Sequence, residues 1–129
     1  MEKKSKEKKP YTITLEHRNG YLYVYGHAKK DSFDISLAFW TAVATYCKDN
    51  KFSKVLVEED FETDTSINDK YELMSQMHKM GFTGITVAFI DRHPEQMTSN
   101  LFGETVALNQ GFIAKVFSNV KEAEEWLLS

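Results

Sequence analysis

The chain has 129 residues, of which 42% are hydrophobic and 13% aromatic, so it can bury one sizeable core without disulfide bonds. Its net charge of −3 gives no general attraction to nucleic acid. No apolar run reaches the roughly 18 residues of a membrane-spanning helix. Cys47 is the only cysteine, which excludes an intramolecular disulfide and fits a reducing cytoplasm. We therefore expect a cytoplasmic protein with no integral membrane segment and no nucleic-acid partner.

The N-terminal segment, residues 1–10, is rich in lysine and lacks the apolar stretch of a signal peptide. Its composition predicts a solvated, disordered basic tail. The alternative is a weak electrostatic contact with an acidic partner or an anionic surface. A single folded domain is then predicted to span residues 11–129.

A β-hairpin is predicted next, because Tyr11–Arg18 and Tyr21–His27 are strand-like and Asn19-Gly20 stands between them. Asn-Gly suits a two-residue turn in which both central residues have positive φ. Such a turn fixes the register and assigns each residue to a face. One face is predicted to carry Ile13, Leu15, Leu22 and Val24. The other is predicted to carry Thr12, Thr14, Glu16, Tyr21, Tyr23 and Tyr25.

Helices and strands alternate along the rest of the chain. A helix capped within residues 31–34 and ending near residue 50 precedes further helices at about 66–80 and 94–109 and a final one from Asn119. Strands are predicted at 54–59, 84–91 and 112–117, and the near-continuous apolar run in 84–91 is typical of a strand covered on both faces. The order β-β-α-β-α-β-α-β-α predicts an α/β fold with a mixed five-stranded sheet.

The C-terminal part of the chain carries the residues of a family resemblance. It reads Phe102-Gly-Glu-Thr-Val-Ala-Leu-Asn-Gln-Gly-Phe, then Ala114-Lys-Val-Phe-Ser-Asn-Val, then Glu122-Ala-Glu-Glu-Trp-Leu. A last strand ending in Val-Phe, followed by a capped helix with Ala-x-x-Trp-Leu, resembles the STAS domain superfamily, in particular its SpoIIAA-like (STAS/SEC14-like) branch. The resemblance covers about residues 11–128 and implies the SpoIIAA-like fold.

The resemblance also implies a function, since proteins of this fold are typically not enzymes. It implies a binding or regulatory module that acts through contacts with a protein partner or with itself, as a homodimer. In the anti-sigma-factor antagonists of the family, a serine at the start of the helix after the third strand is phosphorylated. Ser66, or Thr65, occupies that place here. Ser66-x-x-Asp69 is also a capping-box-like pattern, so a helix cap explains the same serine without regulation.

An acidic run follows the third strand and consists of Glu58, Glu59, Asp60, Glu62 and Asp64. Asp91, Arg92 and His93 end the fourth strand. The carboxyl ends of parallel strands are the usual ligand-binding edge of an open α/β sheet, and clustered carboxylates could hold magnesium. We therefore name Asp60, Asp64, Asp91, Arg92 and His93 as a candidate ligand or metal loop, with a solvated acidic loop as the alternative. No cofactor and no resident metal is predicted. An enzyme using Asp91, Arg92 and His93 ranks last, because no motif places a nucleophile.

The chain has more aromatic and methionine side chains than a small core requires. Aromatic residues and methionine are enriched at protein interfaces. Tyr21, Tyr23 and Tyr25 on the hairpin and Trp40 on the first helix are therefore candidate interface residues. The methionine-rich second helix, together with the SEC14-like resemblance, supports the alternative of a carrier of a small apolar ligand. Protein–protein contact is the first hypothesis and the carrier is the second.

Overall fold

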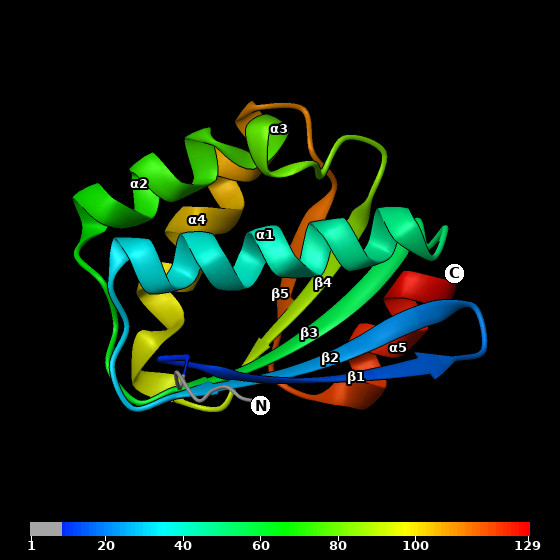
Figure 1. Cartoon of the computed structure of the whole chain (residues 1–129), viewed down its shortest axis with the longest axis horizontal. Helices are drawn as coiled ribbons and strands as arrows, with labels where there is room; N and C mark the ends of the chain where they lie inside the picture. Colours follow the sequence, from blue (N-terminus) through cyan, green and yellow to red (C-terminus); the bar gives the residue numbers. More distant parts are fainter. Residues whose placement is uncertain (1–8) are drawn as a thin grey trace, which may run out of the picture.

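The computed structural model describes residues 9–129, so most of the predicted basic tail (1–10) lies outside the described residues. A five-stranded sheet with the strand order β1-β2-β3-β4-β5 forms the centre of the fold (Figure 1). The strands are β1 (Thr12–Arg18), β2 (Tyr21–Ala28), β3 (Lys54–Phe61), β4 (Thr86–Asp91) and β5 (Ala114–Phe117). β1 is antiparallel to β2, and the other pairs are parallel, which confirms the predicted mixed sheet.

Helices cover both faces of the sheet (Figure 1). The helices are α1 (Phe33–Asp49), α2 (Ile67–Ser75), α3 (Met77–Met80), the 3-10 turn η2 (Pro94–Gln96), α4 (Met97–Asn109) and α5 (Val120–Leu128). α1, α2, α3 and α4 lie on one side, which we call the four-helix face, and α5 lies alone on the other, which we call the α5 face (Figure 1). Each strand alternates its side chains between these two faces.

The β-hairpin has the predicted register. Arg18 pairs with Tyr21, and Leu15 pairs with Val24. Gly20 adopts a φ of 91°, which an L side chain rarely does, and this explains why glycine stands at the turn. Asn19 does not have a positive φ, so the prediction of positive φ at both central residues is wrong for Asn19 and right for Gly20. The register sends Leu22 and Val24 into the core of the four-helix face, so the predicted division of the hairpin into two faces is confirmed.

Several element boundaries differ from the prediction. The helix predicted over 66–80 is two helices, because the backbone leaves the helical conformation at Gln76, with φ −100° and ψ 10°. The break lets Met77 and Met80 both enter the core, at 5% and 6% exposure. Gly81 ends α3 in the left-handed conformation, which suits a glycine. β3 continues two residues beyond the predicted end, and β5 begins two residues later than predicted, at Ala114.

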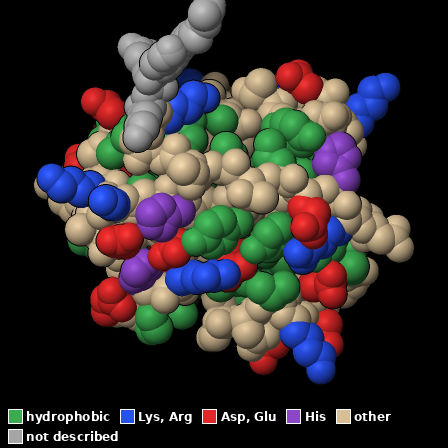
Figure 2. All heavy atoms as spheres, turned by 60° about the horizontal axis from the view of Figure 1, so that its bottom comes forward, with side chains coloured by type: hydrophobic (Ala, Val, Ile, Leu, Met, Phe, Trp, Pro, Cys, Tyr) green, Lys and Arg blue, Asp and Glu red, His purple; other side chains and the backbone are tan. Residues whose placement is uncertain are grey.

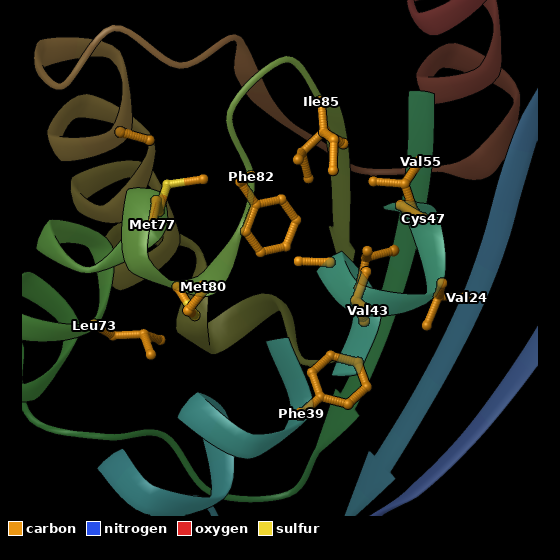
Figure 3. Close-up of a cluster of buried hydrophobic side chains, with 14 of the residues drawn as sticks. Val24, Phe39, Val43, Cys47, Val55, Leu73, Met77, Met80, Phe82 and Ile85 are labelled. Carbon is orange, nitrogen blue, oxygen red and sulfur yellow. The ribbon is translucent and has the colours of Figure 1, made fainter. Parts of the chain in front are cut away.

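The larger core lies on the four-helix face, between the sheet and the helices α1, α2, α3 and α4 (Figure 3). Phe39 of α1, Phe82 before β4, and Val55 of β3 are fully buried in it. Gly26 of β2 lies directly beneath Phe39, and a Cβ atom there would overlap the phenylalanine ring. The close approach of α1 to the sheet therefore requires a glycine at this position.

A smaller core lies beneath α5. It consists of Tyr21, Leu56, Ala88, Ile90, Ala123 and Leu127. Asn119 caps α5 by accepting a hydrogen bond from the Glu122 N–H at 2.9 Å, as the capping pattern predicted. The ring of Trp126 packs against Phe117 with 5.4 Å between centroids. A nine-residue helix cannot cover a whole sheet, so part of the α5 face stays open.

None of the helices between residues 9 and 129 has the length and hydropathy that crossing a membrane requires.

Candidate functional site

The candidate ligand residues at the ends of β3 and β4 do not form one site, because neighbouring residues of a strand point to opposite faces. Asp60 Oδ1 and His93 Nε2 lie 2.7 Å apart. Arg92 lies on the same face and donates a hydrogen bond to Glu58. Asp91 instead bonds to a side chain of α4, and Asp64 lies near a lysine of α2. The structure therefore brings together Asp60, Arg92 and His93, and separates them from the other two.

On the α5 face, tyrosine and arginine side chains surround a carboxylate of β3. The Tyr23 hydroxyl donates to Glu58 Oε1 at 2.5 Å, and Arg92 Nε donates to Glu58 Oε2 at 2.7 Å. The Arg18 guanidinium lies 4.0 Å from the centroid of the Tyr23 ring. Desolvation, followed by the hydrogen bond to Glu58, raises the pKa of the Tyr23 hydroxyl. Tyr23 is therefore a neutral donor at physiological pH.

A second carboxylate, Asp60, is held in the same way one pleat further along β3. The Tyr25 hydroxyl donates to Asp60 Oδ2 at 2.6 Å, and His93 Nε2 lies 2.7 Å from Asp60 Oδ1. The bond from Tyr25, with His93 as a further cause, lowers the pKa of Asp60, and the bond to Asp60 raises the pKa of His93. Arg92 also lies over the Tyr25 ring at 4.9 Å.

These side chains form a continuous open patch. We call the following set the tyrosine–arginine patch: Arg18, Tyr23, Tyr25, Glu58, Asp60, Arg92 and His93. In Figure 2, hydrophobic, basic, acidic and histidine side chains lie side by side on this side of the molecule. The Arg92 side chain is 51% exposed, and both tyrosines are half-buried.

The four-helix face contains a cavity of about 70 Å³ that is partly open to solvent. We call it the α2–α4 cavity. Its apolar wall includes Trp40, Met74, Met77, Met80, Phe82 and Phe89. Its polar lining includes Ser36, Glu59, Lys70 and Asn100. The cavity is thus mainly apolar and has a polar end where β3 and β4 finish.

Glu59 is the unusual group of this cavity. Its side chain enters from β3, the residue is only 5% exposed, and its Oε2 atom is buried without a hydrogen-bond partner among the described residues. Burial, followed by the nearby Asp31, raises the pKa of the Glu59 carboxyl well above its usual range, and Lys70 opposes that rise. A buried acceptor without a donor costs about 1–3 kcal/mol.

The polar groups beside Glu59 are bonded to each other. Lys70 Nζ lies 3.3 Å from Asn100 Oδ1 and 3.5 Å from Asp64 Oδ1. Asn100 Nδ2 donates to Asp91 Oδ2 at 2.8 Å. Burial raises the pKa of Asp91, although its bonds to Asn100 and to the backbone N–H of His93 oppose the rise. Glu59 therefore stands out within a network that otherwise pairs its members.

The candidate phosphoacceptor Ser66 is the N-cap of α2. Its hydroxyl accepts a hydrogen bond from the Asp69 N–H at 3.1 Å, which confirms the helix-cap explanation. The Thr65 N–H donates to Asp64 Oδ1 at 2.8 Å. Ser66 is exposed and Thr65 is half-buried. Phosphorylation at either residue stays a prediction.

The four candidate interface residues do not share one surface. Tyr21 is 1% exposed beneath α5, and its hydroxyl donates to Glu124 at 2.6 Å. Tyr23 and Tyr25 belong to the tyrosine–arginine patch. Trp40 lies on the opposite side of the sheet, in the cavity wall, where its ring centroid is 5.9 Å from that of Phe82. An interface on the α5 face would therefore use Tyr23 and Tyr25 alone of these four.

Within residues 9–129, no three His, Cys, Asp or Glu side chains are grouped so that they could hold a metal ion. The magnesium hypothesis thus finds no coordination site in the described part of the chain. The side chains of Asp91, Arg92 and His93 bond to three different groups, which are Asn100, Glu58 and Asp60 in that order, so the three do not converge on one reacting atom. Cys47 is fully buried, and burial raises the pKa of its thiol to about 11, which disfavours the nucleophilic thiolate.

Sequence reasoning missed Lys70 and Asn100 as site residues and did not separate Glu59 from the acidic run. One signal could have singled out Glu59. Val55, Val57 and Glu59 are two residues apart in a strand, so they face the same way, and an acid then enters an apolar face. No comparable signal joins Lys70 to Asn100, because thirty residues separate them.

Comparison with known proteins identifies the fold. No protein-family model matches the sequence, and no curated protein is significantly similar to it. Among solved structures, the chain is similar to an uncharacterized protein of the DUF3478 family with a SpoIIAA-like fold from Shewanella loihica. The identity is 15% and the TM-score 0.57, over 97% of this chain and 99% of the other. The likeness confirms the predicted SpoIIAA-like fold, and at this identity it shows the fold alone.

Proposed function

We propose that this protein is a non-enzymatic binding module whose ligand is a small, mainly apolar molecule held in the α2–α4 cavity. The observation that carries the proposal is the cavity itself, which lies between the sheet and the helices α1, α2, α3 and α4 and is lined by aromatic and methionine side chains. Ligand sites are typically concave and mostly apolar, with a few polar groups that orient the ligand. The sequence ranked protein contact above a carrier, and we place the carrier first because the cavity supports it.

The size of the cavity limits the ligand. At about 70 Å³ it is smaller than the roughly 150 Å³ apolar cavity that accepts benzene. Met74, Met77 and Met80 line it, and methionine is the most adaptable apolar side chain. A ligand of six to eight carbon atoms would therefore need these methionines to change rotamer, and the opening to solvent gives it a route inwards.

Chemical shift mapping with toluene tests this proposal. We expect toluene to shift backbone amide signals of residues that line the cavity, such as Gly103 and Ala107, and not those of the hairpin turn. Gly103→Leu should abolish the shifts, because a side chain at Gly103 would point at Lys70 and Met74. Thr105→Leu, which adds the same side chain at an exposed position of α4, is the matched control.

The result that would contradict the proposal is equally specific. Toluene shifts confined to the α5 face, or equal shifts in Gly103→Leu and Thr105→Leu chains that both retain native circular dichroism, would place the binding outside the cavity. Native mass spectrometry of the freshly purified protein adds a second readout, since a retained small molecule should be lost in the Gly103→Leu chain.

The second candidate function is the protein–protein contact that the sequence favoured, with another protein or with a second copy of the chain. The tyrosine–arginine patch supports it, because tyrosine and arginine are, with tryptophan, the residues enriched at binding hot spots. Hydrogen bonds to Glu58 and Asp60 hold Tyr23 and Tyr25 in place before any partner arrives. Less side-chain entropy is then lost on binding.

Light scattering over a range of protein concentrations tests self-association through the patch. We expect a dimer that Arg92→Ala weakens, because the exposed guanidinium would contact the partner. Lys121→Ala, at an exposed position of α5 outside the patch, is the control and should leave the dimer unchanged. A wild-type monomer at every concentration would exclude the homodimer and leave only a different protein as partner.

A further inference from the structure

We infer that the ligand of the α2–α4 cavity is a small amphipathic amine, whose ammonium group binds Glu59 while its apolar part lies among the aromatic and methionine side chains. The inference rests on the proposed function, since it names the chemical class of ligand for the same cavity. It goes beyond that proposal by assigning a charge and a hydrogen-bonding direction to the ligand.

The first observation is the free acceptor on Glu59. The residue is 5% exposed, its side chain lines the cavity, and Oε2 has no hydrogen-bond partner within residues 9–129. A ligand that donates an N–H to Oε2 would supply the missing bond. A bound ammonium would also stabilise the ionised form of Glu59 against the effect of burial. Hydrogen bonds between charged groups are about twice as strong as neutral ones, so an ammonium donor gains most from this position.

The second observation is the balance of charge around Glu59. Asp31, Asp64 and Asp91 carry carboxyl groups close enough to influence it, and the ammonium of Lys70 opposes their effect. Lys70 is already directed to Asp64 and to a side-chain amide of α4. A carboxylate ligand would add a further negative charge to this group, which like-charge repulsion opposes. An ammonium ligand would reduce the excess of negative charge.

The third observation is the apolar wall that faces this charged end. The Trp40 ring lies 5.7 Å from the Phe89 ring and 5.9 Å from the Phe82 ring, centroid to centroid. Met74 and Met77 line the same space. A purely polar amine would leave this wall unused, and a hydrocarbon would leave Glu59 unpaired. An alkylamine or arylalkylamine of a few carbon atoms satisfies both parts of the cavity.

Trp40 provides the readout for the test. The other tryptophan, Trp126, lies on the α5 face against Phe117, so a Trp126→Phe chain reports the cavity wall alone. Hexylammonium, 1-hexanol and hexanoate have the same apolar chain and differ in the charge of the head group. Each would be titrated into the full-length chain at about pH 7.5 and moderate ionic strength, with the Trp40 emission recorded.

We expect hexylammonium to bind at least about tenfold more tightly than hexanoate, with 1-hexanol between them, because one charge-assisted hydrogen bond typically contributes that much. Glu59→Gln should remove this preference while 1-hexanol binds within about twofold of its original affinity. Glu125→Gln removes an exposed carboxylate on α5 and is the matched control, which should leave all three affinities unchanged.

Two outcomes overturn the inference. The first is that hexanoate binds as tightly as hexylammonium. The second is that the preference for hexylammonium persists in the Glu59→Gln chain. Binding of 1-hexanol in either case leaves the proposed function intact, and a failure of all three probes removes both. The rank order in the wild-type background does not depend on any Glu59 variant, so a folding defect in Glu59→Gln cannot obscure the answer.

Discussion

The two faces of the sheet use alternate residues of the same strands, and they treat their carboxylates differently. On the α5 face, Glu58 and Asp60 each accept bonds from a tyrosine and from a cationic or imidazole side chain. On the four-helix face, Glu59 is buried in an apolar wall with Oε2 unpaired. Three consecutive acids of one strand therefore have two different environments, and the alternation of the strand is the cause.

This difference between the carboxylates of the two faces indicates where a bound ligand would satisfy an unpaired group. The tyrosine–arginine patch pairs both of its carboxylates internally, so a partner there would add contacts without relieving an unpaired carboxylate. The α2–α4 cavity has one group that the protein itself leaves unsatisfied, and a molecule from outside can correct it. A polar group that is buried and unpaired is consequently a stronger guide to a ligand than a larger cluster that is exposed and paired.

The largest effect is expected at Gly26, where one added methyl group would disturb the packing of the four-helix face. Gly26→Ala should lower the free energy of unfolding by about 3 kcal/mol, because its Cβ would overlap the Phe39 ring in a tightly packed core. Tyr25→Phe, one residue away on the α5 face, should cost about 1 kcal/mol through loss of the bond to Asp60. Urea denaturation of both chains measures the pair. Equal losses would mean that the two faces are packed alike.

The next effect is a gain in stability at Glu59. The pKa of Glu59 is higher in the folded state than in the unfolded state. The free energy of unfolding therefore falls as pH rises above the unfolded-state pKa, until the folded-state pKa is passed. Glu59→Gln should therefore match the wild type near pH 4 and exceed it by about 2 kcal/mol near pH 8, since the buried charge is removed.

Urea denaturation at both pH values checks this gain. Glu125→Gln, at an exposed position, should show no such pH-dependent difference. A Glu59→Gln chain that is less stable than the wild type at high pH would mean that the ionised carboxylate is satisfied after all.

A smaller effect, whose size declines as pH rises, is expected in the patch. The pKa of His93 is raised by Asp60, so their bond stabilises the fold fully below about pH 6.5 and loses strength as pH rises through the folded pKa. His93→Gln should cost about 1 kcal/mol at about pH 5.5 and less near pH 9. Thermal denaturation across this range measures the trend. A cost that grows with pH would contradict the pairing.

The smallest effect is expected at the helix caps, which serve both faces in the same way. Ser66→Ala and Asn119→Ala should each lower the free energy of unfolding by about 0.5–1 kcal/mol, because each leaves one helical N–H without its acceptor. Denaturation curves measure both. If Ser66→Ala leaves the free energy of unfolding unchanged, helix capping does not explain why a serine stands at this position. The case for phosphorylation of Ser66 would then be stronger.

Local signals in the sequence were enough to predict the framework. Asn19-Gly20 predicted the register of the hairpin, Ser66 and Asn119 predicted two helix starts, and the apolar run in β4 predicted a strand covered on both faces. These features depend on neighbouring residues, so local rules reach them. The break at Gln76 depends on how Met77 and Met80 fit the core, and no local pattern shows it.

The candidate site was harder to predict, and one error had a physical origin. The acids after the third strand were treated as one cluster although β3 extends through Phe61 and alternates their directions. The partners of these acids come from distant segments, such as Arg92 for Glu58 and Tyr25 for Asp60. Only the packing of the whole sheet brings them within reach.

The strand order also has a consequence for how the molecule is assembled. Because the strands lie in the sheet in the order in which they occur along the chain, each new strand can add to the free edge of the one before it, and none must insert between two others. Synthesis from the N-terminus could therefore build the sheet progressively. Until α5 docks, however, Leu56 and Ile90 would face water. The nascent protein would then be most prone to aggregation just before this short helix folds.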